Sequence, residues 1–298
     1  MKALWNSAIG LLLINGLLLG ITLPFGKIAA AAGVPPAIWA FVISFGAGSV
    51  LLLALLMNGG RLGLDRRMLR YFFIVAAVSY AIPNLLLFAS IPHLGVGFTG
   101  IMFTMSPLFT LAFSLMLKLR RPSVLGVAGI GVGFIGALIV ALTRGEANQP
   151  AELIWVVAGL LIPVSLAVGN VYRTVDWPEG SGPIQLAAGS HLAAAVMLLV
   201  AAASSAGGLP FGPLAEVPWL VAAQVIVSSA MFAVFFRLQA VGGPVYLSQI
   251  GYVAAAIGLI SGMLFLGESY RLETWLGAVL ISIGLVMTTK AQMRTSEA

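Results

Sequence analysis

The chain is built of long apolar runs separated by short segments rich in proline, glycine and charged residues. A helix needs about 20 mostly apolar residues to cross a bilayer, and each run is close to that length. The longest connections, 58–69 and 205–216, are too short to hold a soluble domain. The pattern predicts an all-α integral membrane protein with ten transmembrane helices, at 8–30, 37–57, 70–90, 96–117, 123–142, 152–174, 183–204, 217–237, 244–265 and 271–290.

The first apolar run also has features of a signal peptide, because Lys2 precedes it and small residues follow at 29–33. We expect a spanning helix instead. The run from Ala8 to Leu23 continues past Pro24 to a length that crosses a bilayer.

A pattern in the first half of the chain recurs in the second half. Residues 244–290 form two apolar segments around the break Leu266-Gly267-Glu268-Ser269, and residues 96–142 form two apolar segments around a basic break at 118–122. A shift of 148 positions places Gly129 and Gly136 on Gly277 and Gly284. This recurrence predicts two five-helix repeats, 1–145 and 146–298. Five helices cross the membrane an odd number of times, so the second repeat is expected to be inverted, as in many secondary transporters.

Composition and charge place the chain in a membrane and suggest its orientation. Sixty per cent of the residues are hydrophobic and only 8% are charged, too few for the surface of a soluble domain. The net charge of +6 is not accompanied by the basic patches of nucleic-acid-binding proteins. With cytoplasmic N- and C-termini, 12 of the 15 Lys and Arg residues lie inside and only Lys27, Arg144 and Arg271 outside. We therefore expect cytoplasmic termini and a monomer in the inner (plasma) membrane, with the lipid bilayer and no nucleic acid as partner.

Several kinds of chemistry lack their residues. The chain has no cysteine and two histidines, His93 and His191, so neither a metal nor another cofactor is expected. No phosphate-binding Gly-x-x-x-x-Gly-Lys loop is present. Ser190 and His191 are adjacent and project about 100° apart on a helix, which is unsuitable for a nucleophile and its base. We expect a transporter and not an enzyme.

The acidic residues suggest how transport is driven. All nine acids lie in loops, at termini or at the ends of the predicted spans. Ion-driven carriers commonly use a carboxylate within the membrane. The sequence therefore predicts facilitated transport or exchange without obligatory ion coupling.

Polar side chains within the spans mark the expected substrate pathway, because unpaired polar groups are unfavourable in hydrocarbon. Serine and threonine can also bond to their own helix, and amides can join neighbouring helices. Three residues of the ninth span, Tyr246, Gln249 and Tyr252, recur every third position and share a face. The predicted substrate-binding residues are Asn15, Tyr80, Asn84, Thr99, Gln224, Ser228, Tyr246, Gln249 and Tyr252.

Small residues and prolines indicate where helices cross closely and bend. Gly16/Gly20, Gly129/Gly133 and Gly258/Gly262 have the spacing of close helix crossings. Prolines within or near the ends of spans remove helical hydrogen bonds and favour bends. These prolines are Pro24, Pro83, Pro107 and Pro163.

The segment Leu266-Gly267-Glu268, the two glycines Gly277 and Gly284, Pro107 and the segment 167–173 together resemble the drug/metabolite transporter superfamily, and within it the EamA-type ten-helix permeases. The chain is most similar to bacterial exporters of amino acids, including aromatic ones. The resemblance implies a cavity lined by the first, third, fourth, sixth, eighth and ninth helices and transport by alternating access. The first break departs from the pattern, with Lys118 and Arg120 in place of Gly-Glu.

The residues within the spans narrow the class of substrate. Phosphorylated substrates favour Lys or Arg at depth, and only Lys27 approaches such a position in the predicted spans. The first helix has Asn15 where a small multidrug exporter would need a glutamate. We expect a neutral or zwitterionic, partly apolar substrate such as an amino acid. The alternative is a broad-specificity drug exporter.

Overall fold

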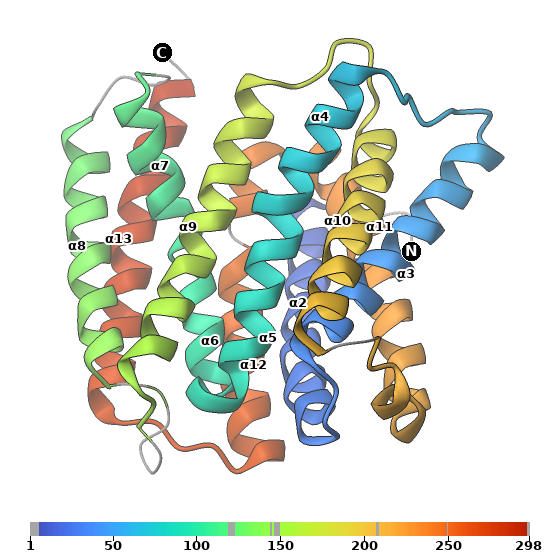
Figure 1. Cartoon of the computed structure of the whole chain (residues 1–298). Coiled ribbons are helices and arrows are strands. Elements are labelled where there is room, and N and C mark those ends of the chain that lie inside the picture. The colour runs from blue at the N-terminus through green and yellow to red at the C-terminus, as the bar shows by residue number, and fades with distance from the viewer. Residues whose placement is uncertain are drawn as a thin grey trace.

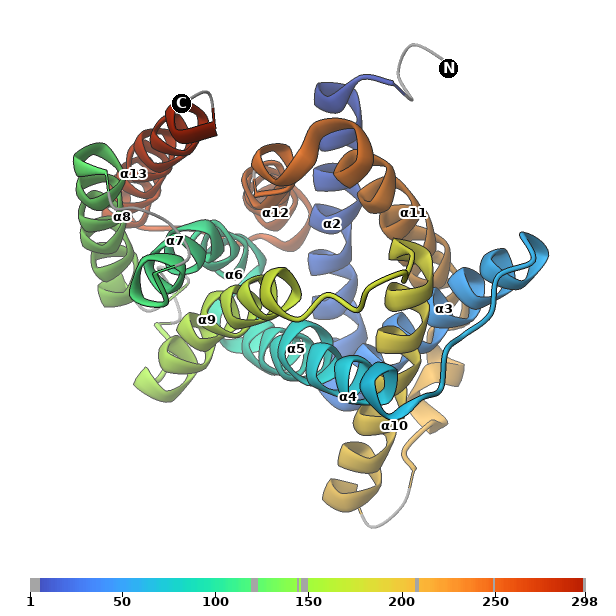
Figure 2. The same ribbon diagram turned by 90° about the horizontal axis from the view of Figure 1, so that it is seen from above.

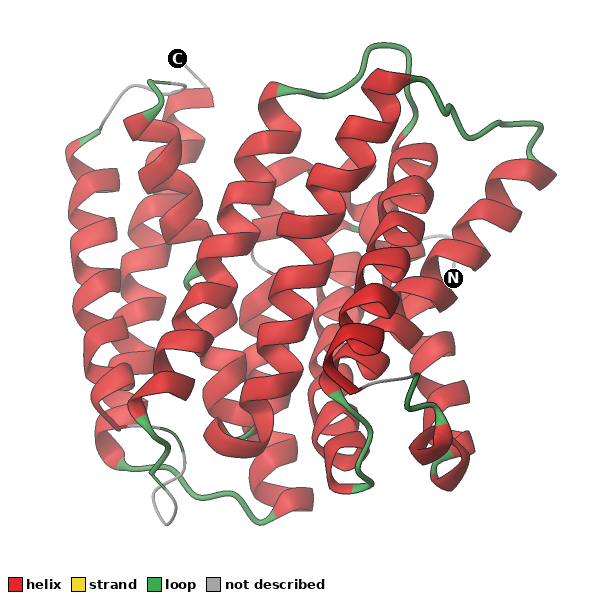
Figure 3. Cartoon of the chain, viewed as in Figure 1, coloured by secondary structure: helices red, strands yellow, loops and turns green. Residues whose placement is uncertain are grey.

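The computed structural model of the chain describes residues 6–118, 123–143, 145, 150–206, 209–248 and 250–296. Within these ranges the secondary structure is helical without a β-strand, and one isolated bridge joins Gly145 to Pro150 (Figure 3). The elements are α2 (Ala8–Ala31), α3 (Pro36–Met57), α4 (Arg66–Val75), the π-helix η1 (Ala76–Ala81), α5 (Ile82–Leu94), α6 (Val96–Phe103), α7 (Ser106–Met116), α8 (Val124–Thr143), α9 (Leu153–Val175), α10 (Pro183–Ala206), the 3-10 helix η2 (Gly212–Glu216), α11 (Pro218–Ser248), α12 (Ile250–Leu266) and α13 (Leu272–Ser296).

The predicted all-α class is confirmed, and every predicted span overlaps a helix. Among the described residues, eight helical segments are long and apolar enough to cross a membrane. Two further apolar helices, Ile250–Leu266 and Leu272–Thr288, are shorter. The break predicted between 237 and 244 was wrong, since α11 continues to Ser248. Gly242, Gly243 and Pro244 therefore lie inside this helix. Glycine and proline occur within transmembrane helices because neighbouring helices can satisfy the backbone groups that are left unpaired.

Helix ends follow from local chemistry. Asp65 precedes α4 and its carboxylate accepts from the amides of Arg67 and Met68, at 2.9 and 3.1 Å, which satisfies donors that have no partner within the helix. Gly95 both ends α5 and precedes α6 with φ of 83°, a value that glycine adopts without strain. This residue lets the chain reverse between two helices without a loop.

Two spans are interrupted within their length. The span Arg66–Leu94 contains the π-helical turn η1 immediately before Pro83, and the span Val96–Met116 is broken at Thr104 and Met105, just before Pro107. Both interruptions lie at prolines that the sequence marked as positions of lost helical hydrogen bonds. Pro24 and Pro163 lie inside α2 and α9, which continue through them.

The helices form a bundle whose ends lie at two opposite edges (Figure 1). Seen from above, α8 and α13 form a pair at one side, α3, α10 and α11 lie at the other, and α2, α5, α6, α9 and α12 lie between them (Figure 2). Helix α3 packs on α10, α2 packs on both α11 and α12, and α9 packs on α5 and α7.

Glycines bring α8 and α13 into close contact. A Cβ atom built on Gly129 would lie 2.6 Å from the carbonyl oxygen of Gly284, and one built on Gly136 would lie 2.7 Å from that of Gly277. Real Cβ atoms essentially never come this close to another atom. The glycines therefore allow an approach of the two backbones that a side chain would prevent, as predicted for Gly129.

Candidate functional site

Buried and half-buried polar groups contact one another at two places in the bundle. The first, here named the Glu268 cluster, joins Lys27, Glu268 and Tyr270 to the start of α6. The second, named the Arg173 cluster, comprises Ser79, Tyr80, Asn170, Arg173 and His191 around the π-helical turn η1.

The Glu268 cluster begins with a reversal of the chain at the end of α12. Gly267 has φ of 68°, and the amide of Glu268 turns back to donate to the carbonyl of Gly262 at 3.0 Å. The Glu268 carboxylate lies against the Cα of Gly262, where any side chain would collide with it. The residue is 4% exposed. The Gly267-Glu268 segment thus turns the carboxylate back against the last turns of α12, where it is buried.

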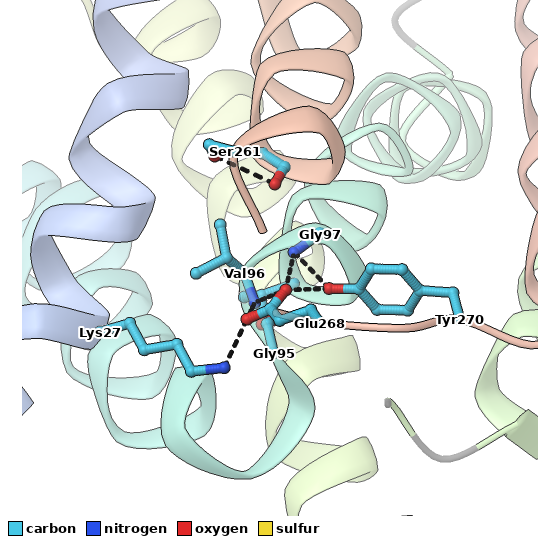
Figure 4. Close-up of polar contacts among 9 residues, drawn as sticks. Lys27, Gly95, Val96, Gly97, Ser261, Glu268 and Tyr270 are labelled. Atoms are coloured by element: carbon cyan, nitrogen blue, oxygen red, sulfur yellow. Dashed lines mark hydrogen bonds and ion pairs between the residues drawn. The ribbon is translucent and has the colours of Figure 1, made fainter. Parts of the chain in front are cut away.

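Every hydrogen-bond partner of the Glu268 carboxylate is a donor. The Lys27 ammonium lies 2.6 Å from Oε1, the Val96 amide donates at 2.8 Å, and the Gly97 amide donates to Oε2 at 3.2 Å. The Tyr270 hydroxyl also donates to Oε2 (Figure 4). The N-terminus of a helix favours a negative charge, and the ammonium supplies the counter-charge that a buried carboxylate needs. The cluster holds α2, α6 and the α12–α13 connection together.

The Arg173 cluster is organised by a side chain near the end of α9 that turns into the bundle. Arg173 donates through Nη1 to Ser79 Oγ at 2.8 Å and through Nη2 to Asn170 Oδ1 at 2.6 Å. The Asn170 amide nitrogen in turn donates to Thr110 Oγ1 at 3.2 Å. These bonds connect α9 with η1 and α7.

The nearby acid, Asp176, is engaged elsewhere. It forms an ion pair with Arg70 at 2.9 Å and accepts from the Tyr172 hydroxyl at 2.5 Å. Within the described residues, the ion pairs are Lys27–Glu268 and Arg70–Asp176. The acceptors of Arg173 are therefore a neutral hydroxyl and a neutral amide.

Aromatic rings pack around Tyr80, the residue that follows Ser79 in η1. The ring of Tyr80 stacks on His191 with centroids 3.8 Å apart, and His191 meets Phe232 edge to face at 4.1 Å. His191 is completely buried, and neither of its ring nitrogens has a hydrogen-bond partner among the described residues. His191 thus packs among aromatic rings inside the bundle.

Two adjacent residues of the π-helical turn, Ser79 and Tyr80, contact different helices of the bundle. Pro83 has no amide hydrogen, which favours a widened turn ahead of it. The carbonyl of Val78 accepts from Ser165 Oγ of α9 at 2.8 Å. In this turn Ser79 contacts Arg173 of α9 while Tyr80 contacts His191 of α10.

The predicted substrate-binding residues differ in their burial and in whether their polar groups have hydrogen-bond partners. Tyr80 belongs to the Arg173 cluster. Asn15 and Gln224 are 1% and 0% exposed, and their amide groups, like the Tyr252 hydroxyl, have no partner among the described residues. Burial of a polar group without a hydrogen-bond partner is unfavourable, because the group loses its hydration.

For the remaining predicted residues, the structure gives less support for a role in substrate binding. Thr99 donates to the carbonyl of Gly95 at 2.6 Å and Ser228 to that of Gln224 at 2.8 Å, so each hydroxyl is satisfied within its own helix segment. Asn84 is half-buried. Gln249 and the side chain of Tyr246 lie outside the described residues.

Of the residues that define these clusters, only Tyr80 was predicted as functional. Lys27 was counted on the outer side of the membrane and Glu268 was described as part of a break between two apolar segments, but the two side chains pair with each other. Arg173 was counted among the residues of the cytoplasmic edge, whereas its guanidinium reaches Ser79, inside a span. The available signal was its spacing, because Asn170 and Arg173 lie three residues apart on one helix face.

Comparisons with known proteins agree with this architecture. Residues 6–142 match the EamA-like transporter family. A WAT1-related protein of Arabidopsis thaliana is 26% identical over 198 residues, which cover 62% of this chain and 58% of that protein. The match thus spans less than two thirds of that relative's length.

A solved structure described only as a crystal structure of a protein covers 96% of this chain and 99% of its own, with a TM-score of 0.63 and 20% identity. At this identity the similarity establishes the fold. It extends beyond the family match into the second half of the chain.

Proposed function

Starting from an EamA-like transporter domain at residues 6–142 of a multi-pass membrane protein, we propose that the whole chain is a permease of the drug/metabolite transporter superfamily. It exports small neutral or zwitterionic metabolites across the inner (plasma) membrane by facilitated alternating access. The proposed substrates are amino acids, including aromatic ones.

The Arg173 cluster carries this proposal. Small-molecule sites combine aromatic surface with a few polar groups that fix orientation. Tyr80, His191 and Phe232 provide the aromatic faces, and Arg173 provides charged donors that are held at Ser79, the residue before Tyr80. All four residues lie within helices of the bundle.

Alternating access rests on the proposed inverted repeats, for which helix pairing provides support. If the first five spans correspond to the last five, the packing of α2 on α11 and α12 corresponds to that of α9 on α5 and α7. The glycine contacts follow the same rule. The shift of 148 positions converts the pair Gly129 and Gly284 into the pair Gly277 and Gly136, and both pairs are in contact.

The proposed orientation has cytoplasmic termini. The α3–α4 connection lies at the same edge of the bundle as the C-terminal end of α13 (Figure 1). This connection and the start of α4 carry Arg61, Arg66 and Arg67. Basic residues favour the cytoplasmic side, which supports placing this edge inside.

A broad exporter of hydrophobic cations is the second candidate. The aromatic rings would suit such compounds, but the positive charge of Arg173 in the same cluster would repel a cation. Within the described part of the chain, Arg173 has no carboxylate partner to offset that charge. The geometry therefore favours the neutral or zwitterionic substrate.

Uptake of labelled phenylalanine into liposomes containing the purified protein tests this function. Tyr80→Ala removes a ring of the site and is expected to raise KM about 10-fold, whereas Phe45→Ala, which alters a ring 51% exposed on α3, should leave transport unchanged. Equal transport by both variants and the wild type would contradict the proposed site. Absence of transport by the wild type for all amino acids would contradict the proposed function.

A further inference from the structure

Arg173 extends into the bundle and not toward the nearest membrane edge. It lies in the last turn of α9, where arginine ordinarily extends to the aqueous boundary. Its guanidinium instead bonds to Ser79, which lies 13 positions beyond Arg66, the first residue of its span. The positive charge is thus placed inside the membrane-spanning part of the protein.

The contacts of Arg173 do not neutralise its charge. A guanidinium has five N–H donors in a planar array that matches a carboxylate. The bonds to Ser79 and Asn170 orient two of its nitrogens and supply no negative charge. Asp176, three residues along the chain, pairs with Arg70. A charge within the membrane is unfavourable without a counter-ion and commonly marks a substrate pathway.

The aromatic residues of the Arg173 cluster indicate what kind of body the ligand has. Tyr80 directly follows Ser79, and its ring stacks on His191 beside Phe232. This aromatic surface thus begins one residue after the hydroxyl that holds the guanidinium. The unpartnered ring nitrogens of His191 add polar atoms to that surface.

We propose that Arg173 binds the carboxylate of the substrate, and that the substrates are small zwitterionic carboxylates with an apolar or aromatic body, of which aromatic amino acids are one group. This inference rests on the proposed transport function and specifies the chemical class of its ligand. Ser79 and Asn170 are positioning residues that hold the guanidinium, while Tyr80 contacts the body of the ligand.

The experiment compares phenylalanine with phenylalaninamide, in which an amide replaces the carboxylate. Each is measured in liposomes with the wild type, Arg173→Gln and Arg173→Lys. The ratio of the two transport efficiencies within one variant is independent of how much protein folds. The wild type should prefer phenylalanine by about 10-fold to 100-fold, the range expected for hydrogen bonds to a charged group.

Arg173→Gln should reduce this preference to near unity, and Arg173→Lys should retain part of it because the charge remains. Ser79→Ala should raise KM for phenylalanine while keeping a preference for the acid. An unchanged ratio in Arg173→Gln would overturn the inference and leave the transport function intact. A wild type that transports neither compound nor any other amino acid would overturn the transport function and the inference with it.

Discussion

The Lys27 ammonium lies 2.6 Å from the buried carboxylate of Glu268, a residue 241 positions further along the chain. The contact joins the first helix of one proposed repeat to the last connection of the other. The carboxylate also accepts from the amides of Val96 and Gly97, so it holds the start of α6 against α2 and the α12–α13 connection. The Gly267-Glu268 segment thus has a structural role that depends on a distant lysine.

Lys27→Met should destabilise the protein. Removing one partner of a buried ion pair leaves a charge with less compensation, and the remaining donors to Glu268 limit the loss to about 1–3 kcal/mol. The expected decrease in Tm of the detergent-solubilised protein is about 3–8 °C. Arg271→Met, at an exposed residue of the same connection, is the control and should leave Tm unchanged. Equal Tm values for the two variants would contradict the role of the pair.

Exchanging the two charges should not restore stability. In the double variant Lys27→Glu and Glu268→Lys, the new ammonium would face the amide hydrogens of Val96 and Gly97, which need an acceptor. The double variant should therefore unfold at a lower temperature than Lys27→Met. Recovery of wild-type Tm would show that the ion pair alone matters.

The contact between α8 and α13 should tolerate no added methyl group. Gly136→Ala would place Cβ 2.7 Å from both the Gly277 carbonyl oxygen and the Ile281 amide nitrogen, backbone atoms that cannot move independently. Overpacking of this kind costs about 1–3 kcal/mol. Gly131 lies on the same helix with no atom within 4 Å of its added Cβ, so Gly131→Ala should stabilise slightly through helix propensity. Thermal unfolding of the two variants measures the difference, and similar Tm values would contradict the close packing.

The sequence predicted the helices well and the polar contacts poorly, for physical reasons. Hydrophobic runs and prolines act locally, so the spans and the irregular turns at Pro83 and Pro107 could be located. A contact such as Lys27–Glu268 depends on which helix ends meet in space, which the order of residues does not specify. Arg173 was misplaced because its α9 position indicates a membrane edge, while its long side chain reaches inward to Ser79.

Acid should weaken the link between α4 and the end of α9. The hydrogen bond from the Tyr172 hydroxyl, together with the charge of Arg70, lowers the pKa of Asp176 below its ordinary value. A lowered pKa stabilises the fold above the unfolded pKa of about 4, and this stabilisation is lost as the pH falls through the lower folded pKa. Asp176→Asn should decrease Tm equally at pH 8 and pH 6, by an effect of less than about 1 kcal/mol, and the decrease should shrink below pH 4. The exposed Glu179→Gln is the control. A decrease that changes between pH 6 and pH 8 would contradict this assignment.

Transport should not depend on a proton gradient. Among the described residues, Glu268 is the one acid that is buried, and its carboxylate is held by an ammonium, two amides and a hydroxyl. We therefore expect phenylalanine in liposomes to reach the same final concentration with and without an imposed pH gradient. Accumulation above the external concentration only in the presence of the gradient would refute facilitated transport.

Counterflow in liposomes tests the central claim most directly. Vesicles containing the purified wild-type protein are loaded with one unlabelled compound from a panel of amino acids, other metabolites and hydrophobic cations, and the entry of labelled phenylalanine is followed. The proposed function predicts a transient accumulation of label with aromatic amino acids inside and none with hydrophobic cations. Counterflow driven by the cations and not by any amino acid would contradict it and favour a drug exporter.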